Sequence, residues 1–287
     1  MNPWDLERGS AVVTDDDVRR LCDFVYRQTG MLFAQDKRYY IDRRLAERMA
    51  ATASPSFSAY FAVLRTNAEN EIEHLVNCFT VNETYFYREE HQFRCLTSTL
   101  LEVIAPKKQP GEPIRIWSVP CSTGEEPYSI AIWLLENWER VDKYEIEIIG
   151  SDIDTSVLRS AGAGIYGERA LHRLPKDLIP RYFEKDDEGR YHILPEIRDS
   201  LQFTRANIVD PAQTLLHRNF DVIFCRNILM YFDEASRRLA AENLFDSLVP
   251  GGFICLGHTE SMSRISALFD ACQFADAMVY RRPPEGS

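Results

Sequence analysis

The chain has 287 residues and a formal net charge of −11 at neutral pH, with 45% hydrophobic and 27% charged residues. Its length suits one large domain or two ordinary ones, and its acidic balance argues against a general nucleic-acid-binding protein. The cysteines are scattered and form no C-x-x-C pair, which favours free thiols over disulfides or zinc ligands. The N-terminus lacks a signal-peptide pattern and no apolar run could span a bilayer, so we expect a cytoplasmic protein without direct membrane insertion.

Residues 14–85 are predicted to form a small all-helical domain. Thr14 precedes three aspartates and a stripe of apolar residues at helical spacing, a pattern typical of a helix start. Further helices are expected over residues 37–51, 58–64 and 69–80.

The helix at 37–51 has a basic face on an otherwise acidic protein. Arg43, Arg44 and Arg48 contribute to this face. One interpretation is a solvated helix whose arginines pair with Asp42 and Glu47. The other is a docking surface for an acidic partner helix, and both interpretations stay open.

From residue 86 to 282 the pattern changes to alternating strands and helices, which predicts a doubly wound α/β sheet. Five strands and a closing antiparallel hairpin are expected at residues 114–117, 145–150, 201–206, 220–225, 253–257 and 274–281. Residues 162–199 interrupt this alternation with a short helix between prolines, a turn and another strand.

The loop that follows the first strand, residues 119–124, is the most informative stretch. It has a single glycine, and Glu125 and Glu126 stand where a phosphate-binding loop would offer bare amides. Ser122 or Thr123 is expected to cap the following helix. A nucleotide bound here would lack phosphates, and S-adenosylmethionine, which carries a sulfonium cation, fits. The alternative, ordinary turn chemistry, stays open from this loop alone.

Carboxylates also follow the second strand. Asp152 lies where doubly wound folds place the acid that binds ribose hydroxyls, and Asp154 is better explained as the cap of the next helix. Glu125 is preferred over Glu126 as a ligand contact. The histidines are dispersed without ligand spacing, so no metal site is expected.

Three motifs together resemble the CheR-type chemotaxis receptor methyltransferases over roughly residues 14–282. They are Ser122-Thr-Gly-Glu-Glu-Pro-Tyr-Ser-Ile-Ala131, Asn82-x-Thr-x-x-x-Arg88 and Cys225-Arg-Asn-x-x-x-Tyr-Phe232. The resemblance implies an S-adenosylmethionine-dependent methyltransferase that esterifies glutamates on the cytoplasmic methylation helices of chemotaxis receptors, for sensory adaptation. It also implies that the basic helix meets those receptor helices. We also expect a monomer.

The resemblance further assigns site residues. The implied cofactor contacts, besides Glu125 and Asp152, are Asn82, Thr84, Arg88, Asn207, Ile208, Arg226 and Asn227. Arg226 and Tyr231 are the catalytic candidates, either holding the substrate carboxylate or lining the methyl channel, and core packing is an equal alternative for Tyr231.

The family also carries a small antiparallel β subdomain, expected here at about residues 165–199. Members that hold a receptor C-terminal pentapeptide tend to have a longer hairpin loop than Lys185 to Gly189, so we expect no pentapeptide tether.

The expected chemistry needs no acid–base pair. A glutamate is already ionised at neutral pH, so methyl transfer to it rests on proximity and alignment. Two other hypotheses remain: a methyltransferase acting on a small carboxylic acid, and a non-catalytic module that binds the cofactor.

Overall fold

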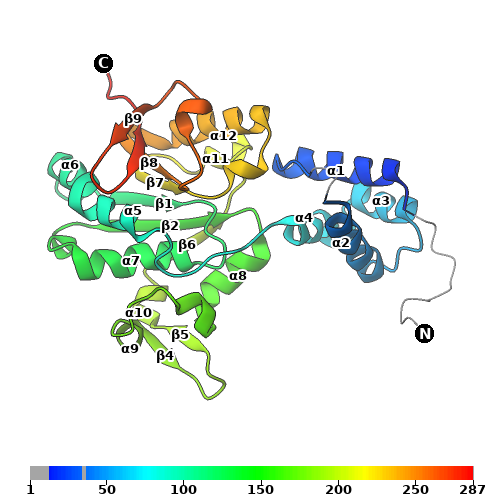
Figure 1. Cartoon of the computed structure of the whole chain (residues 1–287), viewed down its shortest axis with the longest axis horizontal. Helices are drawn as coiled ribbons and strands as arrows, with labels where there is room; N and C mark the ends of the chain where they lie inside the picture. Colours follow the sequence, from blue (N-terminus) through cyan, green and yellow to red (C-terminus); the bar gives the residue numbers. More distant parts are fainter. Residues whose placement is uncertain (1–12, 34–36, 287) are drawn as a thin grey trace. The chain divides into compact units, whose positions relative to one another are not determined.

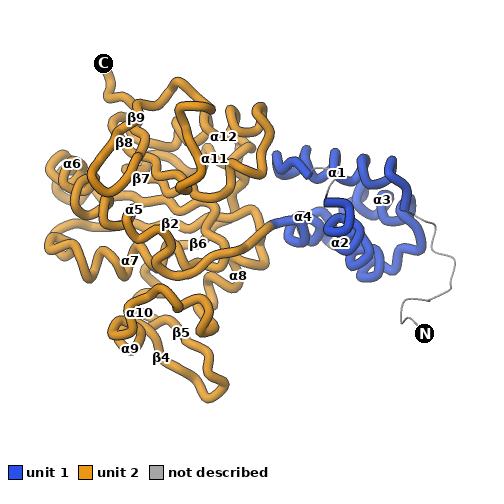
Figure 2. Tube along the Cα trace, viewed as in Figure 1, with its two compact units in different colours: residues 1–80 blue, residues 81–287 orange. Residues whose placement is uncertain are grey.

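The computed structural model describes residues 13–33 and 37–286. The chain divides between Thr80 and Val81 into two compact units, which we call the helical unit and the sheet unit (Figures 1 and 2). Within the described residues, no helix has both the length and the apolar character that crossing a membrane requires.

The helical unit is built from short amphipathic helices around one small core. Its elements are α1 (Asp15–Thr29), α2 (Arg38–Ala51), α3 (Phe57–Thr66), the 3-10 turn η2 (Ala68–Asn70) and α4 (Glu71–Phe79). Thr14 caps α1 through a reciprocal pair of hydrogen bonds with Asp17, which confirms the predicted start. Apolar side chains such as Leu21, Ile41 and Tyr60 are fully buried between the helices.

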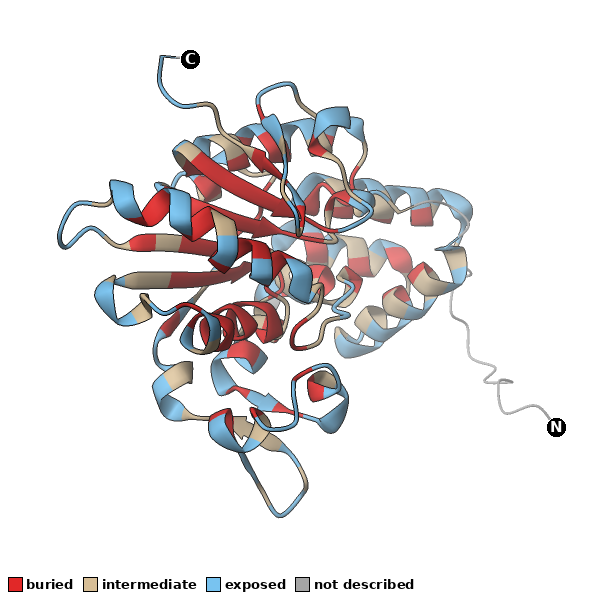
Figure 3. Ribbon diagram, turned by 60° about the vertical axis from the view of Figure 1, so that its left-hand side comes forward, coloured by how far each residue is buried: buried red, intermediate tan, exposed pale blue. Residues whose placement is uncertain are grey.

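The sheet unit contains a seven-stranded sheet in the order β6-β2-β1-β7-β8-β10-β9. Its strands are β1 (Ile114–Ser118), β2 (Ile146–Asp152), β6 (Leu201–Arg205), β7 (Phe220–Cys225), β8 (Leu248–Leu256), β9 (Asp270–Gln273) and β10 (Met278–Arg281). The first five are mutually parallel, and β10 pairs antiparallel with both β8 and β9. All six residues of β7 are buried, as an apolar run in a parallel strand predicts (Figure 3).

The direction of winding reverses between β1 and β7. The chain runs outward through β1, β2 and β6, then returns to the other side of β1 to form β7 and β8. Right-handed crossovers therefore put α7 (Glu125–Asn137) and α12 (Glu234–Ser247) on opposite faces (Figure 1). Ligands of such sheets bind beyond the carboxyl ends of the strands at this reversal.

Shorter helices complete the sheet unit. They are α5 (Glu90–Cys95), the π-helical turn η3 (Leu96–Leu100), α6 (Leu101–Ile104), η4 (Ala105–Lys107), η5 (Val141–Lys143), α8 (Thr155–Ala163), α11 (Pro211–Thr214), η7 (Leu229–Tyr231) and η8 (Met262–Arg264).

The predicted antiparallel insertion is present as a second, three-stranded sheet in the order β3-β5-β4. It consists of β3 (Ile165–Tyr166), η6 (Glu168–Leu171), α9 (Ile179–Tyr182), β4 (Phe183–Lys185), β5 (Tyr191–Ile193) and α10 (Pro195–Arg198). Lys185 pairs with Tyr191, so the hairpin loop is short. The overall fold class is therefore confirmed.

Several predicted details were wrong. The second strand extends to Asp152, the fifth already begins at Leu248, and the first arm of the closing hairpin is Asp270–Gln273. Neither Ser122 nor Thr123 caps α7, because Gly124 occupies the cap position with a φ of 94°. That backbone conformation and the close approach of Tyr128 and Ala161, each 3.0 Å from where a Cβ would lie, require glycine.

Candidate functional site

Asp152 ends β2 next to the loop after β1. Its two carboxylate oxygens accept hydrogen bonds from the backbone N–H groups of Ser122 (2.9 Å) and Asp154 (3.0 Å). The residue is 3% exposed, and burial raises the pKa of its carboxyl to about 6. Since a carboxylate accepts about four hydrogen bonds, the backbone contacts leave capacity for ribose hydroxyls.

Asp154 caps α8, as predicted. Its Oδ1 accepts from the backbone N–H groups of Ser156 (2.8 Å) and Val157 (3.3 Å). Its other oxygen accepts a hydrogen bond from the Asn82 side-chain amide at 3.0 Å. This contact joins Asn82, an implied cofactor contact, to the carboxyl end of β2.

The two glutamates that open α7 have different surroundings. Glu126 accepts from the Ser118 hydroxyl (2.7 Å) and forms an ion pair with Arg226. Glu125 accepts from the Thr123 hydroxyl (2.6 Å), and burial raises the pKa of its carboxyl. Because Glu126 is engaged by the protein interior, the geometry favours Glu125 as the ligand contact, and this choice stays a prediction.

Arg226 is buried and forms ion pairs with neighbouring carboxylates. It is 5% exposed, and besides its ion pair with Glu126 its Nη1 lies 3.7 Å from a Glu89 carboxylate oxygen. The same nitrogen donates a hydrogen bond to the Arg88 carbonyl at 2.8 Å. Two carboxylates therefore balance one guanidinium, and Arg226 ties β7, α7 and the segment around residue 88 together.

The remaining implied contacts also lie in the sheet unit. The Arg88 guanidinium donates to the Glu83 carbonyl at 2.7 Å, and Thr84 in the same segment is half-buried. Asn207 and Ile208, which follow β6, are 6% and 5% exposed. The Ile208 carbonyl accepts from the Asn243 side chain at 2.9 Å, which fixes this loop against α12.

The adjacent strands β6, β2, β1 and β7 thus bring most of the predicted residues to one edge. Asp152, Glu125, Asn207, Arg226 and Tyr231 all stand at or just after carboxyl ends of these parallel strands. The group combines carboxylates and amides with no phosphate-binding loop. Carboxylates can accept hydrogen bonds from the ribose hydroxyls and can lie near the cationic end of S-adenosylmethionine, and side-chain amides can both donate and accept.

Comparison with known protein families decides the identity. The model of the CheR methyltransferase SAM-binding domain matches residues 82–278, and that of the CheR methyltransferase all-alpha domain matches residues 16–80. The chain belongs to the CheR methyltransferase family. It is an S-adenosylmethionine-dependent methyltransferase, which confirms the resemblance, the enzyme class and the cofactor predicted from the three motifs.

Relatives of this family member match along nearly their whole length. Chemotaxis protein methyltransferase 2 of Vibrio cholerae is 45% identical over 276 residues, covering 96% of each chain. The chemotaxis protein methyltransferase of Escherichia coli K12 is 31% identical over 261 residues, covering 90% of this chain and 88% of that one.

Sequence reasoning missed one residue of this CheR family member, Glu260. Its carboxylate accepts from the backbone N–H groups of Asn227 (2.8 Å), Leu229 (2.7 Å) and Gly257 (3.0 Å). A Cβ on Gly257 would lie 2.6 Å from the Asn227 side chain, so the two segments approach closely. The signal was Gly257-His-Thr-Glu260, an acid one turn after a strand-end glycine. Glu260 thereby fixes the loop that holds Asn227 and Tyr231.

The three predicted docking arginines belong to α2 of the helical unit. Arg44 donates to the Cys78 carbonyl and its guanidinium lies 3.2 Å from the Tyr40 ring centroid. Arg48 pairs with Glu71, whose side chain is 3% exposed. Arg43 is exposed and pairs with Glu47 at 3.0 Å, as the solvated-helix interpretation expects. Only Arg43 of the three is exposed.

Proposed function

We propose that this chain transfers the methyl group of S-adenosylmethionine to glutamate side chains on the cytoplasmic helices of chemotaxis receptors, as part of sensory adaptation. Support comes from membership of the CheR family, with family models matching residues 16–80 and 82–278. Relatives that match along most of the chain bear the name chemotaxis protein methyltransferase. No feature of the chain favours a small carboxylic acid as substrate.

In this proposal, different residues would contact the ribose, the adenine, the methionine end and the sulfonium of the cofactor. Asp152 would accept the ribose hydroxyls, and the loop at Asn207 and Ile208 would border the adenine. Asn82, Thr84 and Arg88 would hold the polar methionine end, where a guanidinium suits a carboxylate. Glu125 would face the cationic part. When bound, the cofactor would supply a sulfonium-activated methyl group, and breaking its S–CH3 bond would leave S-adenosylhomocysteine, a neutral thioether, as the product.

For catalysis, the enzyme's side chains have to align the substrate glutamate with the methyl group. The glutamate attacks as a carboxylate and needs no general base, so alignment carries the rate. Tyr231 is half-exposed on η7 and is our candidate for contact with the substrate. Arg226 is buried and balanced by two carboxylates, so we retain it as a candidate that acts by fixing the loop after β7.

We propose two features of receptor recognition. Arg43 on α2 would meet an acidic receptor helix, beside Tyr39, whose side chain is 82% exposed. No pentapeptide tether is expected, because Asp186 closes the short loop between β4 and β5 with hydrogen bonds from the backbone N–H groups of Glu188 (3.0 Å) and Arg190 (2.8 Å). Calorimetry with receptor C-terminal pentapeptides tests this, and micromolar binding would contradict it.

The decisive assay uses labelled S-adenosylmethionine and receptor cytoplasmic fragments. We expect label on the receptor that is released by mild base, as a methyl ester requires. An enzyme that binds the cofactor but labels no receptor fragment would refute the substrate assignment.

A further inference from the structure

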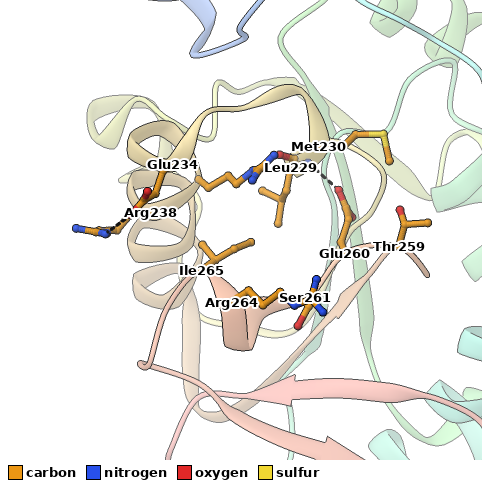
Figure 4. A pocket seen from close by; sticks show the side chains of 10 residues that line it. Leu229, Met230, Glu234, Arg238, Thr259, Glu260, Ser261, Arg264 and Ile265 are labelled. Atoms are coloured by element: carbon orange, nitrogen blue, oxygen red, sulfur yellow. Dashed lines mark hydrogen bonds and ion pairs between the residues drawn. The ribbon is translucent and has the colours of Figure 1, made fainter.

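A pocket of about 250 Å³ opens beside η7, the 3-10 helix that follows β7 (Figure 4). It is lined by Leu229 and Met230 of η7, by the first turns of α12 and by the segment from Thr259 to Ile265. Tyr231, the third residue of η7, is the proposed substrate contact. The pocket and the proposed methyl-transfer site therefore share one helical turn.

Three arginines and two glutamates line the pocket, so its lining has an excess of positive charge. Arg237 donates its Nε hydrogen to the Leu229 carbonyl at 2.8 Å and makes no ion pair with any described carboxylate. Arg264 is exposed at the pocket, and among residues 13–33 and 37–286 no side-chain hydrogen bond or ion pair engages its guanidinium. The third lining arginine, Arg238, pairs with Glu234 at 3.0 Å on the exposed side.

Glu260, which also lines the pocket, makes its hydrogen bonds to the backbone and forms no ion pair with a lining arginine among the described residues. The Glu260 carboxylate already accepts the three backbone N–H groups of residues 227, 229 and 257, and burial raises its pKa. Figure 4 shows Glu260 directed toward Leu229 and Met230. The contacts also hold η7 in place, so an anion in the pocket would lie at a fixed position relative to Tyr231.

We propose that Arg237 and Arg264 bind a second acidic side chain of the receptor helix, located one helical turn from the glutamate that is methylated. This inference rests on the proposed function. Residues three or four apart on a helix lie about 5–6 Å apart at their Cβ atoms, a separation that one turn of η7 can span. On a chain of net charge −11, two guanidiniums without carboxylate partners favour an acidic occupant. The pocket would thus select the register of the substrate helix.

The test reverses the charge of Arg264 and measures methylation of a receptor fragment. Arg264→Glu should raise KM for the fragment by about tenfold with a smaller change in kcat, since like charges then face each other. S-adenosylmethionine affinity by calorimetry should stay at the wild-type value. The matched control is Lys107→Glu, the same charge change at an exposed lysine of η4. This helix comes before the amino end of β1, whereas the pocket is lined by residues that follow the carboxyl ends of β7 and β8.

A charge swap identifies the partner residue. Each acidic residue three or four positions from the modified glutamate is changed to Lys, and one such fragment should regain methylation by Arg264→Glu. Arg264→Gln serves as the milder variant if the reversal impairs folding, and a KM increase of about threefold is expected.

Three results would overturn the inference: unchanged KM in both Arg264 variants, an equal loss in Lys107→Glu, or no fragment that restores Arg264→Glu. A wild-type enzyme that methylates no fragment would instead refute the proposed function, and the inference with it.

Discussion

The arginines of α2 and those of the pocket beside η7 look alike in sequence but differ in what they contact. In the helical unit, Arg48 is tied to the buried Glu71, and Arg44 donates to the Cys78 carbonyl. In the sheet unit, Arg264 is exposed at a pocket without a carboxylate partner among the described residues. A basic stripe on a helix can thus serve internal packing, while Arg264, at the end of the short 3-10 helix η8, has no such partner among the described residues.

The largest effect in this comparison is expected from breaking the buried ion pair between Arg48 and Glu71 in the helical unit. Arg48→Ala should lower the free energy of unfolding of the helical unit by about 3–5 kcal/mol, because Glu71 stays buried without its counter-charge. Urea denaturation measures this. Arg43→Ala, on the same helix but exposed, should change stability by less than about 0.5 kcal/mol. Equal losses in the two variants would contradict the distinction between them.

Glu260 is an acidic side chain whose hydrogen bonds are all made within the protein. Glu260→Gln puts an amide NH2 against a backbone N–H and should lower kcat about thirtyfold, corresponding to about 2 kcal/mol. The affinity for S-adenosylmethionine should change less, since Asp152 and Glu125 are untouched. The matched control is Glu242→Gln, an exposed glutamate of α12. A wild-type kcat in Glu260→Gln would show that the loop does not depend on this carboxylate.

The Asp152 carboxylate accepts hydrogen bonds from backbone N–H groups and is also predicted to bind the cofactor. Its pKa is raised to about 6 by burial, so below that pH the folded protein holds the neutral acid. The affinity of the wild type for S-adenosylmethionine should therefore fall about tenfold between pH 7 and pH 5. The Asp152→Asn variant should bind S-adenosylmethionine about tenfold more weakly than the wild type at pH 7, and its affinity should be nearly independent of pH. Calorimetry across this range is the measurement. A variant with wild-type affinity and pH dependence would mean that the ribose contact is misplaced.

The raised pKa of Asp152 affects protein stability in the opposite direction from cofactor affinity: a lower pH favours the folded state. Because the folded pKa lies above the unfolded value of 3.8, the contribution of Asp152 to stability is present below about pH 4 and is lost as the pH rises to about 6. Comparing the pH dependence of unfolding for wild type and Asp152→Asn isolates this contribution.

The smallest effect is expected for Arg43, the exposed arginine of α2. Arg43→Glu should raise KM for a receptor fragment about threefold, and added salt should reduce the difference, since exposed pairs are weak and screened. Arg65→Glu, an exposed site on α3, serves as the control. A tenfold or larger effect that persists in high salt would indicate a desolvated contact that the exposure of Arg43 does not predict.

Local patterns in the sequence determined much of this protein. The apolar run Phe220–Cys225 predicted a buried strand, and Thr14 and Asp154 predicted two helix starts. These predictions succeed because propensity, capping and strand-end position depend on neighbours within a few residues.

The tertiary structure alone decided which charged side chains are already engaged. Arg226 pairs with Glu126, a hundred positions away, and Glu260 receives backbone amides from residues 227 and 229 across two loops. Glu71 neutralises Arg48 from another helix. Such pairings depend on which strand and helix ends the fold brings together. The energy of a charge depends on its burial and its partner, and neither quantity is present in the local sequence.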